Sequence, residues 1–405
     1  MCGIIGGNKY KSVDKVKDGL KSIMHRGIDD NTIFSFDDKM YISHNRLSII
    51  DPLQRSNQPF LEDELVLSFN GEIYNHKELR KKLEFKGYNF LTSSDTEVII
   101  KLFKEYGIDS FRMLSGIFSI ALYDKRKDCL YLIRDIVGIK PLYYLYDNLK
   151  KKFFFSSLIK PLLLNLESKE INNLSVLSYA NFNRNDFAET FFKKIFKVIP
   201  GELIIFDNKN KILNKEHFLK YNFNYNYDQK SIKKNIENIF SNQFVSDVPV
   251  ALSLSGGIDS NLIFSELIKS QNKFNCYSVF FSNSKKHSND FLLASELCRS
   301  HNIDLTPVEV SPKDFINYSE KIVNIVESYD GIIFSERAIV FFLALVGRLY
   351  FIEEKLWKRT YRGPLMNRED RLKDPSVLER RKIRFPFFKH EICFHANKIY
   401  EKFLD

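Results

Sequence analysis

The chain begins Met1-Cys2-Gly3-Ile4-Ile5-Gly6-Gly7, and this stretch decides how the first half of the sequence is interpreted. If the initiator Met1 is removed, Cys2 carries a thiol and a free α-amine on one residue. The thiol is mostly protonated near pH 7, because its reference pKa is about 8.5. The α-amine, with a reference pKa of about 7.7–8.0, can accept the thiol proton directly or through a water. Position alone favours an ordinary cysteine, so the interpretation depends on the residues that follow.

The composition indicates a globular protein with enough chain for two domains. The sequence has 405 residues, of which 44% are hydrophobic and 28% charged, and both fractions are typical of folded proteins. The net charge is +10, which invites a nucleic-acid interpretation. Lys and Arg are, however, spread along the sequence and are not gathered with interleaved aromatic residues. We therefore expect no nucleic-acid partner.

Cysteine usage and hydropathy predict a cytoplasmic protein without a membrane segment. The cysteines are odd in number and far apart, and no CxxC pair indicates a zinc site or a disulfide framework. No apolar run of signal-peptide type stands at the N-terminus. The most apolar stretch, 338–347, is shorter than the about 20 residues that a spanning helix needs. The five cysteines are Cys2, Cys129, Cys276, Cys298 and Cys393.

The first part of the chain predicts antiparallel sheets covered by helices. Short runs of β-forming residues at 39–43, 64–69, 118–123 and 129–134 are separated by turn signals. Segments 77–85 and 96–106 show the apolar spacing of helices. We expect this domain to cover residues 2–206 and to end in a closing strand. Residues 207–230, which are polar and rich in Asn, Lys and Tyr, are the predicted linker.

The pattern changes after residue 230 to alternating strands and helices. Strands are expected at 248–254, 276–281 and 305–310, and helices at 261–269, 290–301 and 312–327. The strands are almost entirely apolar, which is typical of a parallel sheet buried on both faces. Residues 231–405 therefore predict a doubly wound parallel-sheet domain, and the whole chain is assigned to the α/β class.

Four segments of the first domain carry polar residues that a strand-rich core does not need. They read RLSIID at 46–51, NGEIYNH at 70–76, SDTE at 94–97 and RDIVGIKPLY at 134–143. Together with Cys2, their order and spacing resemble the class II glutamine amidotransferases, and asparagine synthetase most closely. The resemblance covers residues 2–206. It implies an N-terminal-nucleophile αββα sandwich in which Cys2 hydrolyses glutamine.

The chemistry of glutamine explains the residue types in these segments. Arg46 suits the α-carboxylate, since a guanidinium matches it in a bidentate fashion. Asp95, with help from Glu72, suits the α-amine. The resemblance further implies that Asn70 and the Gly71 backbone N–H stabilise the oxyanion formed when Cys2 attacks. The alternative for Arg46 and Asp95 is a solvated surface pair. Further glutamine-binding residues implied by the resemblance are Leu47, Ser48, Ile49 and Ile50.

A second constellation, Ser255-Gly256-Gly257-Ile258-Asp259-Ser260, follows the first predicted parallel strand. Two glycines let backbone amides face an anion at a helix N-terminus, and the absence of Gly-Lys-Ser/Thr excludes a Walker A loop. The loop resembles the pyrophosphate loop of the ATP pyrophosphatases, although a plain strand-to-helix turn is the alternative. The resemblance implies ATP as substrate, Mg²⁺ near Asp259, and adenosine between Leu254 and Val279.

The sequence departs from asparagine synthetases at two places. In the segment 25–30, Ile28 replaces the family's proline, which removes a turn restraint and no chemical group. The second is a missing acidic Ser-Gly-Asp/Glu-Gly-x-Asp-Glu loop, which in the family touches ATP and the acyl-adenylate. The sequence does not determine whether the shortened second domain makes product.

The function expected from both constellations is glutamine-dependent asparagine synthesis. Ammonia released at Cys2 would amidate an AMP-activated aspartate in the second domain. Two alternatives stay open: amidation of another acceptor, such as a sugar or a cell-surface precursor, and a glutaminase whose inactive second domain makes it a regulator or subunit. The expected small-molecule partners are glutamine, ATP and aspartate, and a homodimer is the candidate assembly.

Overall fold

The computed structural model describes residues 1–311, with gaps at 9–12, 37–38, 183–184, 186–187, 219–233, 235–236, 241, 271–273 and 282–284. Beyond these, it describes residues 313, 314, 317, 318 and 325. The helix predicted at 312–327 therefore lies largely outside the described residues, as does the rest of the chain to residue 405. Among the described helices, none combines the length and the apolar character that crossing a membrane requires.

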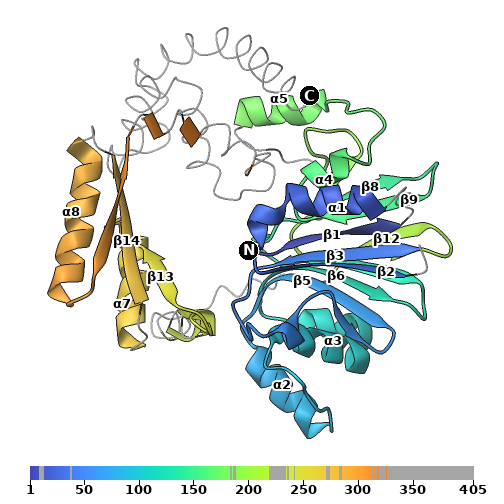
Figure 1. Ribbon diagram of the computed structural model, residues 1–405, viewed down its shortest axis with the longest axis horizontal. Helices are drawn as coiled ribbons and strands as arrows, with labels where there is room; N and C mark the ends of the chain where they lie inside the picture. Colours follow the sequence, from blue (N-terminus) through green and yellow to red (C-terminus); the bar gives the residue numbers. More distant parts are fainter. Residues whose placement is uncertain are drawn as a thin grey trace, which may run out of the picture.

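Two six-stranded antiparallel sheets form the first domain (Figure 1). The first sheet has the order β10-β8-β9-β1-β3-β2 and the second has the order β12-β11-β7-β6-β5-β4. The first sheet contains β1 (Gly3–Asn8), β2 (Asp30–Phe36), β3 (Met40–Arg46), β8 (Tyr143–Asp147), β9 (Lys152–Ser156) and β10 (Ile195–Lys197). The second contains β4 (Phe60–Glu62), β5 (Leu65–Ile73), β6 (Gly116–Asp124), β7 (Cys129–Arg134), β11 (Glu202–Asp207) and β12 (Ile212–His217).

Helices cover the outer faces of both sheets, which confirms the predicted αββα sandwich (Figure 1). On the first sheet, Leu20 of α1 (Val13–Ser22) packs against Ile5, and α4 (Lys160–Leu163) covers the neighbouring strands. On the second sheet, α2 (His76–Phe85) and α3 (Asp95–Tyr106) bury apolar side chains against β5, β6 and β7. The remaining helices of this domain are α5 (Asn173–Phe182) and the short η1 (Met24–Arg26), η2 (Gln54–Ser56) and η3 (Gly107–Met113).

The core between the two sheets fixes where β1 can lie. Ile4 of β1 and Ile42 of β3 are fully buried against Val66 and Leu132 of the second sheet. On β1, Gly6 is needed because a Cβ there would overlap the Phe155 ring and approach Tyr41 O to 2.5 Å. The small residues of the opening sequence thus let β1 occupy the centre of the first sheet, between β3 and β9.

Strand β12 was not expected from the sequence. The segment 207–230 was predicted to be the linker, but residues Ile212–His217 pair antiparallel with β11. Their side chains are mostly exposed and polar, as is typical of an edge strand, and Leu213 packs against the core between the sheets. The chain therefore stays in the second sheet through His217.

A parallel sheet follows in the second part of the chain, as predicted. It runs in the order β13 (Val250–Ser253), β14 (Phe274–Phe281) and β15 (Leu305–Val310), with both pairings parallel. Helices α7 (Ile258–Lys269) and α8 (Lys285–Ser300) connect these strands. Phe264 and Leu267 of α7 pack with Cys298 of α8 and with the sheet in one buried cluster.

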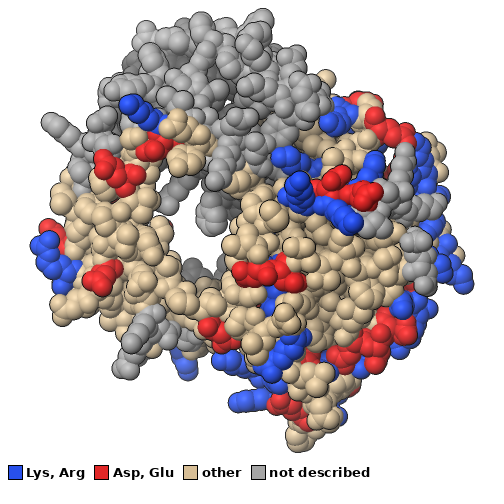
Figure 2. Space-filling view, in the orientation of Figure 1, with Lys and Arg blue, Asp and Glu red and all other residues tan. Residues whose placement is uncertain are grey.

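Charged side chains of both signs are interspersed on the face of the molecule shown in Figure 2. Lys and Arg lie beside Asp and Glu on that face, and no single basic patch dominates it. The expected absence of a nucleic-acid partner remains a prediction.

Candidate active site

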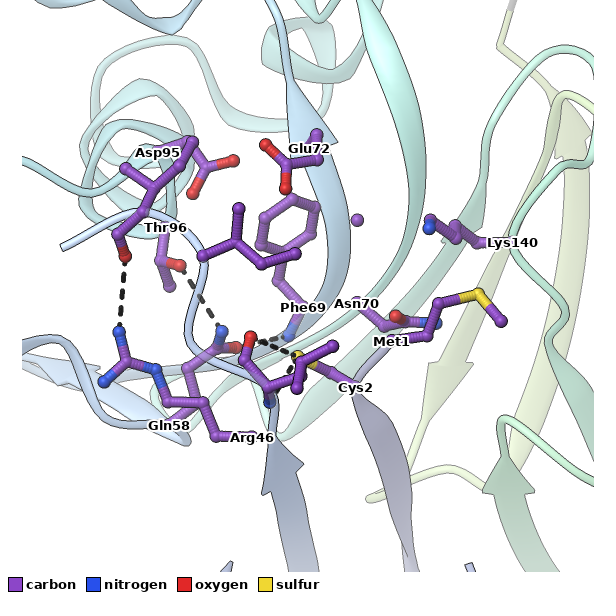
Figure 3. A pocket seen from close by; sticks show the side chains of 14 residues that line it. Met1, Cys2, Arg46, Gln58, Phe69, Asn70, Glu72, Asp95, Thr96 and Lys140 are labelled. Atoms are coloured by element: carbon purple, nitrogen blue, oxygen red, sulfur yellow. Dashed lines mark hydrogen bonds between the residues drawn. The ribbon is translucent and has the colours of Figure 1, made fainter. Parts of the chain in front are cut away.

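One pocket brings the predicted glutamine-site residues together (Figure 3). It opens where the start of β1, the end of β3, the edge of β5 and the N-terminus of α3 meet. All the residues predicted for glutamine line it except Ser48, whose backbone N–H instead donates to Asp29 Oδ2 at 2.7 Å. The pocket is lined by Met1, Cys2, Arg46, Leu47, Ile49, Ile50, Gln58, Phe69, Asn70, Gly71, Glu72, Asp95, Thr96 and Lys140.

Cys2 is held by the backbone that follows β3. Pairing of Gly3 with Asn45 brings Cys2 to the end of β3, where its sulfur reaches the Leu47 backbone. The thiol accepts a hydrogen bond from the Leu47 N–H at 3.3 Å and lies 3.6 Å from the Leu47 carbonyl oxygen, to which it can donate. Arg26 Nε donates to the Cys2 carbonyl at 2.9 Å. The Leu47 backbone thus holds the sulfur, and Arg26 holds the main chain of Cys2.

The electrostatics around Cys2 suit a thiol paired with an amine base. Burial raises the pKa of the Cys2 thiol, and the Leu47 N–H and the positive N-terminus oppose this. Burial lowers the pKa of the N-terminal amine, which the described chain carries on Met1, and the charges of Arg26 and Lys140 lower this pKa further. Both shifts favour the uncharged forms of the Cys2 thiol and of the Met1 amine.

Gly71 lies on an edge of β5 that faces the pocket. Beyond Leu67, β4 no longer pairs with β5, and the Phe69 and Ile73 N–H groups donate sideways to Gln58 Oε1 and Asp95 Oδ2. Since alternate N–H groups of a strand point to the same edge, the Gly71 N–H points to this edge as well. A side chain at Gly71 would overlap the Ile117 carbonyl oxygen of β6, so only glycine fits.

Asn70 offers a second polar group at the same end of the pocket. Its side chain is buried, and its Nδ2 lies 3.4 Å from Ser119 Oγ. Among the described residues, its Oδ1 has no hydrogen-bond partner. Rotating the amide by half a turn would let Oδ1 accept from the Ser119 hydroxyl and would present the Nδ2 donor instead. In either orientation one polar atom of this amide has no hydrogen-bond partner among the described residues.

Arg46 has a larger structural role than the sequence suggested. Its guanidinium donates to the Leu53 and Asp51 carbonyl oxygens at 2.9 and 2.6 Å, and to Asn57 Oδ1 at 2.6 Å. A longer bond of 3.4 Å reaches the Ile50 carbonyl, and Nε has no partner within the described part of the chain. Arg46 is therefore not a solvated surface charge. A ligand carboxylate can be met at Nε and by exchange of the long bond to Ile50.

Two carboxylates face each other across the pocket from Arg46 (Figure 3). Asp95 begins α3, where the Ser94 side chain caps the helix, and burial raises the Asp95 pKa. Burial and the charge of Asp95 raise the pKa of Glu72 to about 7, while Lys140 opposes the shift. A ligand ammonium placed between these carboxylates would relieve their repulsion.

Several lining residues were not singled out by the sequence analysis. Gln58 holds the edge of β5 through its bond to the Phe69 N–H, and its Nε2 lies 3.4 Å from Thr96 Oγ1. The backbone of Lys140 is held at both ends, by Asp135 Oδ2 at 3.0 Å and Arg134 Nε at 2.8 Å. Burial lowers the pKa of Lys140. Lys140 lay within the quoted 134–143 motif, so its charge could have been used.

The predicted ATP residues surround the turn between β13 and α7. Gly256 adopts φ +70, and Ser260 Oγ lies 3.2 Å from Ser255 Oγ and 3.0 Å from the Gly257 carbonyl. Leu254 is buried, its N–H bonded to the Tyr277 carbonyl, and Val279 lies on the adjacent strand with 48% of its surface exposed. Asp259 is exposed in the first turn of α7. These contacts place the predicted residues around one helix N-terminus.

A protein-only metal centre is not present in the described part of the chain. No group of three or more His, Cys, Asp and Glu side chains converges there. Mg²⁺ is commonly bound by one or two carboxylates together with substrate phosphates and waters. The exposed carboxylate of Asp259 is compatible with that mode of binding. By itself it cannot form an Mg²⁺ site from protein groups alone.

Comparison with known proteins assigns the first domain to a family. Residues 1–218, more than half of the chain, match the family model described as the glutamine amidotransferase domain, and the chain belongs to that family. Residues 231–348 match the model described as asparagine synthase. The resemblance stated from the motifs is confirmed.

Curated relatives of the chain are asparagine synthetases. It is 34% identical over 337 residues to asparagine synthetase [glutamine-hydrolyzing] 1 of Bacillus subtilis, covering 80% of this chain and 52% of the relative. It is 32% identical over 293 residues to putative asparagine synthetase [glutamine-hydrolyzing] 2 of Methanocaldococcus jannaschii, covering 65% and 56%. The chain thus spans about half the length of the curated relatives it matches.

A solved structure with similarity to the chain is the glutamine phosphoribosylpyrophosphate amidotransferase of B. subtilis complexed with ADP and GMP. The TM-score is 0.42 at 16% sequence identity, and the match covers 76% of this chain and 81% of that chain.

The pKa of Glu72 predicts how glutamine affinity depends on pH. With a pKa of about 7 in the empty pocket, Glu72 is mostly neutral at pH 6 and mostly ionised at pH 8. Only the ionised form attracts the glutamine ammonium, so KM for glutamine should fall by about tenfold over this range. Glu72→Gln should remove most of this slope. The exposed Glu216→Gln is the matched control, and an unchanged slope in Glu72→Gln would show that another group titrates.

Proposed function

We propose that the chain catalyses glutamine-dependent asparagine synthesis. The observation that carries the first half is the convergence of Cys2, the Gly71 edge, Asn70, Arg46 and two carboxylates on one pocket. The pocket offers Arg46 to the α-carboxylate of glutamine, and Asp95 and Glu72 to its α-amine. Cys2 lines the same pocket as Asn70 and Gly71, the residues proposed to stabilise the oxyanion. The membership of residues 1–218 in the glutamine amidotransferase family supports the same assignment.

The glutaminase step uses the residues in the following roles. After removal of Met1, the amine of Cys2 accepts the thiol proton, and the sulfur attacks the side-chain amide carbon of glutamine. The Gly71 N–H and the Asn70 side chain stabilise the oxyanion. Collapse of this intermediate breaks the C–N bond, and the amine returns the proton to the leaving ammonia. Water then hydrolyses the thioester to glutamate and the free thiol.

The second domain would consume the ammonia. The turn at Ser255, Gly256, Gly257 and Ser260 would bind the ATP phosphates through backbone N–H groups and hydroxyls at the N-terminus of α7. Transfer of AMP to a carboxylate releases pyrophosphate, and attack by ammonia releases AMP and forms the amide. Aspartate is the proposed acceptor because the curated relatives are asparagine synthetases. Mg²⁺ held by Asp259 and the phosphates, a cytoplasmic location and a homodimer belong to the same proposal.

Cys2→Ala tests the glutaminase assignment. The variant should lower the rate of glutamate release from glutamine by more than about 10⁴-fold, because the nucleophile is lost. Its circular dichroism and melting temperature should stay close to those of the wild type. Cys129→Ala, which removes the thiol of the first residue of β7, is the control and should keep full activity. Glutamate release by Cys2→Ala at the wild-type rate would refute the assignment.

Asp259→Asn tests the ATP site and identifies the acceptor reaction. ATP affinity in the presence of Mg²⁺ should fall by about tenfold or more, as is usual when a carboxylate of a metal site is lost. Glu309→Gln, an exposed acid on β15, should bind ATP as the wild type does. Aspartate-dependent pyrophosphate release and the mass of the amidated product are measured on the full chain. If the product derives from another acceptor, that acceptor replaces aspartate in the proposal. ATP binding without any product would favour a glutaminase with an inactive second domain.

A further inference from the structure

Asp247, in the second part of the chain, contacts the loop beside the glutamine pocket. This residue precedes β13, the strand that leads into the predicted ATP loop. The Asp247 N–H donates to the Ile49 carbonyl at 3.1 Å. In return, Asp247 Oδ2 accepts from the Asp51 N–H at 2.8 Å. Two hydrogen bonds in opposite directions thus join Asp247 to the loop that follows β3.

The loop that Asp247 contacts forms one wall of the pocket. Ile49 and Ile50 line the pocket directly. The Asp51 carbonyl accepts the 2.6 Å bond from Arg46 Nη2, so Asp51 also holds the guanidinium proposed to meet the glutamine carboxylate. Any shift of residues 49–51 therefore moves both the apolar wall and the cation of the site.

Asp51 has a backbone conformation that needs support from its surroundings. Its φ is +45, a value that non-glycine residues seldom adopt, and only 2% of its surface is exposed. Its carboxylate is already used, because Oδ2 accepts from the Ser93 N–H at 2.8 Å and from Arg55 Nε at 3.0 Å. Its backbone N–H is satisfied by Asp247, which is itself exposed. Without Asp247, the N–H of a buried residue would lose its acceptor.

We propose that Asp247 is a positioning residue for glutamine binding, contributed by the part of the chain that leads into the ATP loop. By holding residues 49–51, it keeps Arg46 and the apolar wall in the arrangement that binds glutamine. This inference rests on the proposed glutaminase function. It also means that the glutamine pocket is incomplete when the first domain lacks the segment around Asp247.

The test uses glutamine binding to the full chain in the absence of turnover. In a Cys2→Ala background, glutamine affinity is measured by calorimetry for the parent and with Asp247→Ala, Asp247→Asn or Glu296→Gln added. Asp247→Ala should weaken binding by about fivefold or more, because the Asp51 N–H loses its acceptor. Asp247→Asn should bind nearly as well as the parent, since its side-chain oxygen still accepts. Glu296→Gln, an exposed acid on α8, is the matched control and should have no effect.

A second measurement separates positioning from a general loss of folded protein. With Cys2 intact, Asp247→Ala should raise KM for glutamine and leave kcat for glutamate release unchanged, whereas misfolding lowers kcat at constant KM. Equal glutamine affinity of the parent and Asp247→Ala would overturn this inference and leave the glutaminase assignment standing. Failure of the Cys2→Ala parent itself to bind glutamine would overturn the proposed function, and this inference with it.

Discussion

The position of β1 between β3 and β9 is the constraint on which the candidate site depends. Pairing with β3 brings Cys2 to the end of that strand, and the Leu47 backbone then holds the sulfur. The close approach to Phe155 and Tyr41 is possible because position 6 is glycine. The proposed nucleophile thus stands directly before a buried central strand, although it lies next to a chain end.

Two nearby carboxylates, Asp95 buried and Glu72 half-buried, raise the free energy of the empty pocket, and a cationic ligand would lower it. Burial and the charge of Asp95 raise the pKa of Glu72, and the charge of Lys140 opposes this shift. Carboxylates that lie close to each other and are shielded from water favour a ligand that carries an ammonium. Arg46 differs, since its bonds to the loop at 50–57 prearrange a cation and leave Nε for an incoming carboxylate. This separation of charge is what the proposed binding of an amino acid requires.

Most of the sandwich could be predicted from the sequence, as could most of the residues that line the pocket. Strands such as β5 and β6 are runs of β-forming residues bounded by turn signals, α3 carries its cap and its periodic apolar face, and the motifs contain most of the pocket residues. Three features depended on tertiary contacts that no local pattern reveals: the edge strand β12, the use of Arg46 as an anchor for its own loop, and the bonds between Asp247 and residues 49–51. The raised pKa of Glu72 likewise arises from burial and from the nearness of Asp95 in space.

The central claim is that Cys2, as the first residue of the mature chain, forms a covalent thioester with the glutamyl group. The most direct measurement is mass spectrometry of the N-terminal peptide after the enzyme has been mixed with glutamine and quenched in acid. We predict a peptide that begins at Cys2, lacks Met1 and carries the mass of one glutamyl group, which hydroxylamine removes. A glutamyl group on another residue, or full activity of a chain that retains Met1, would contradict the account.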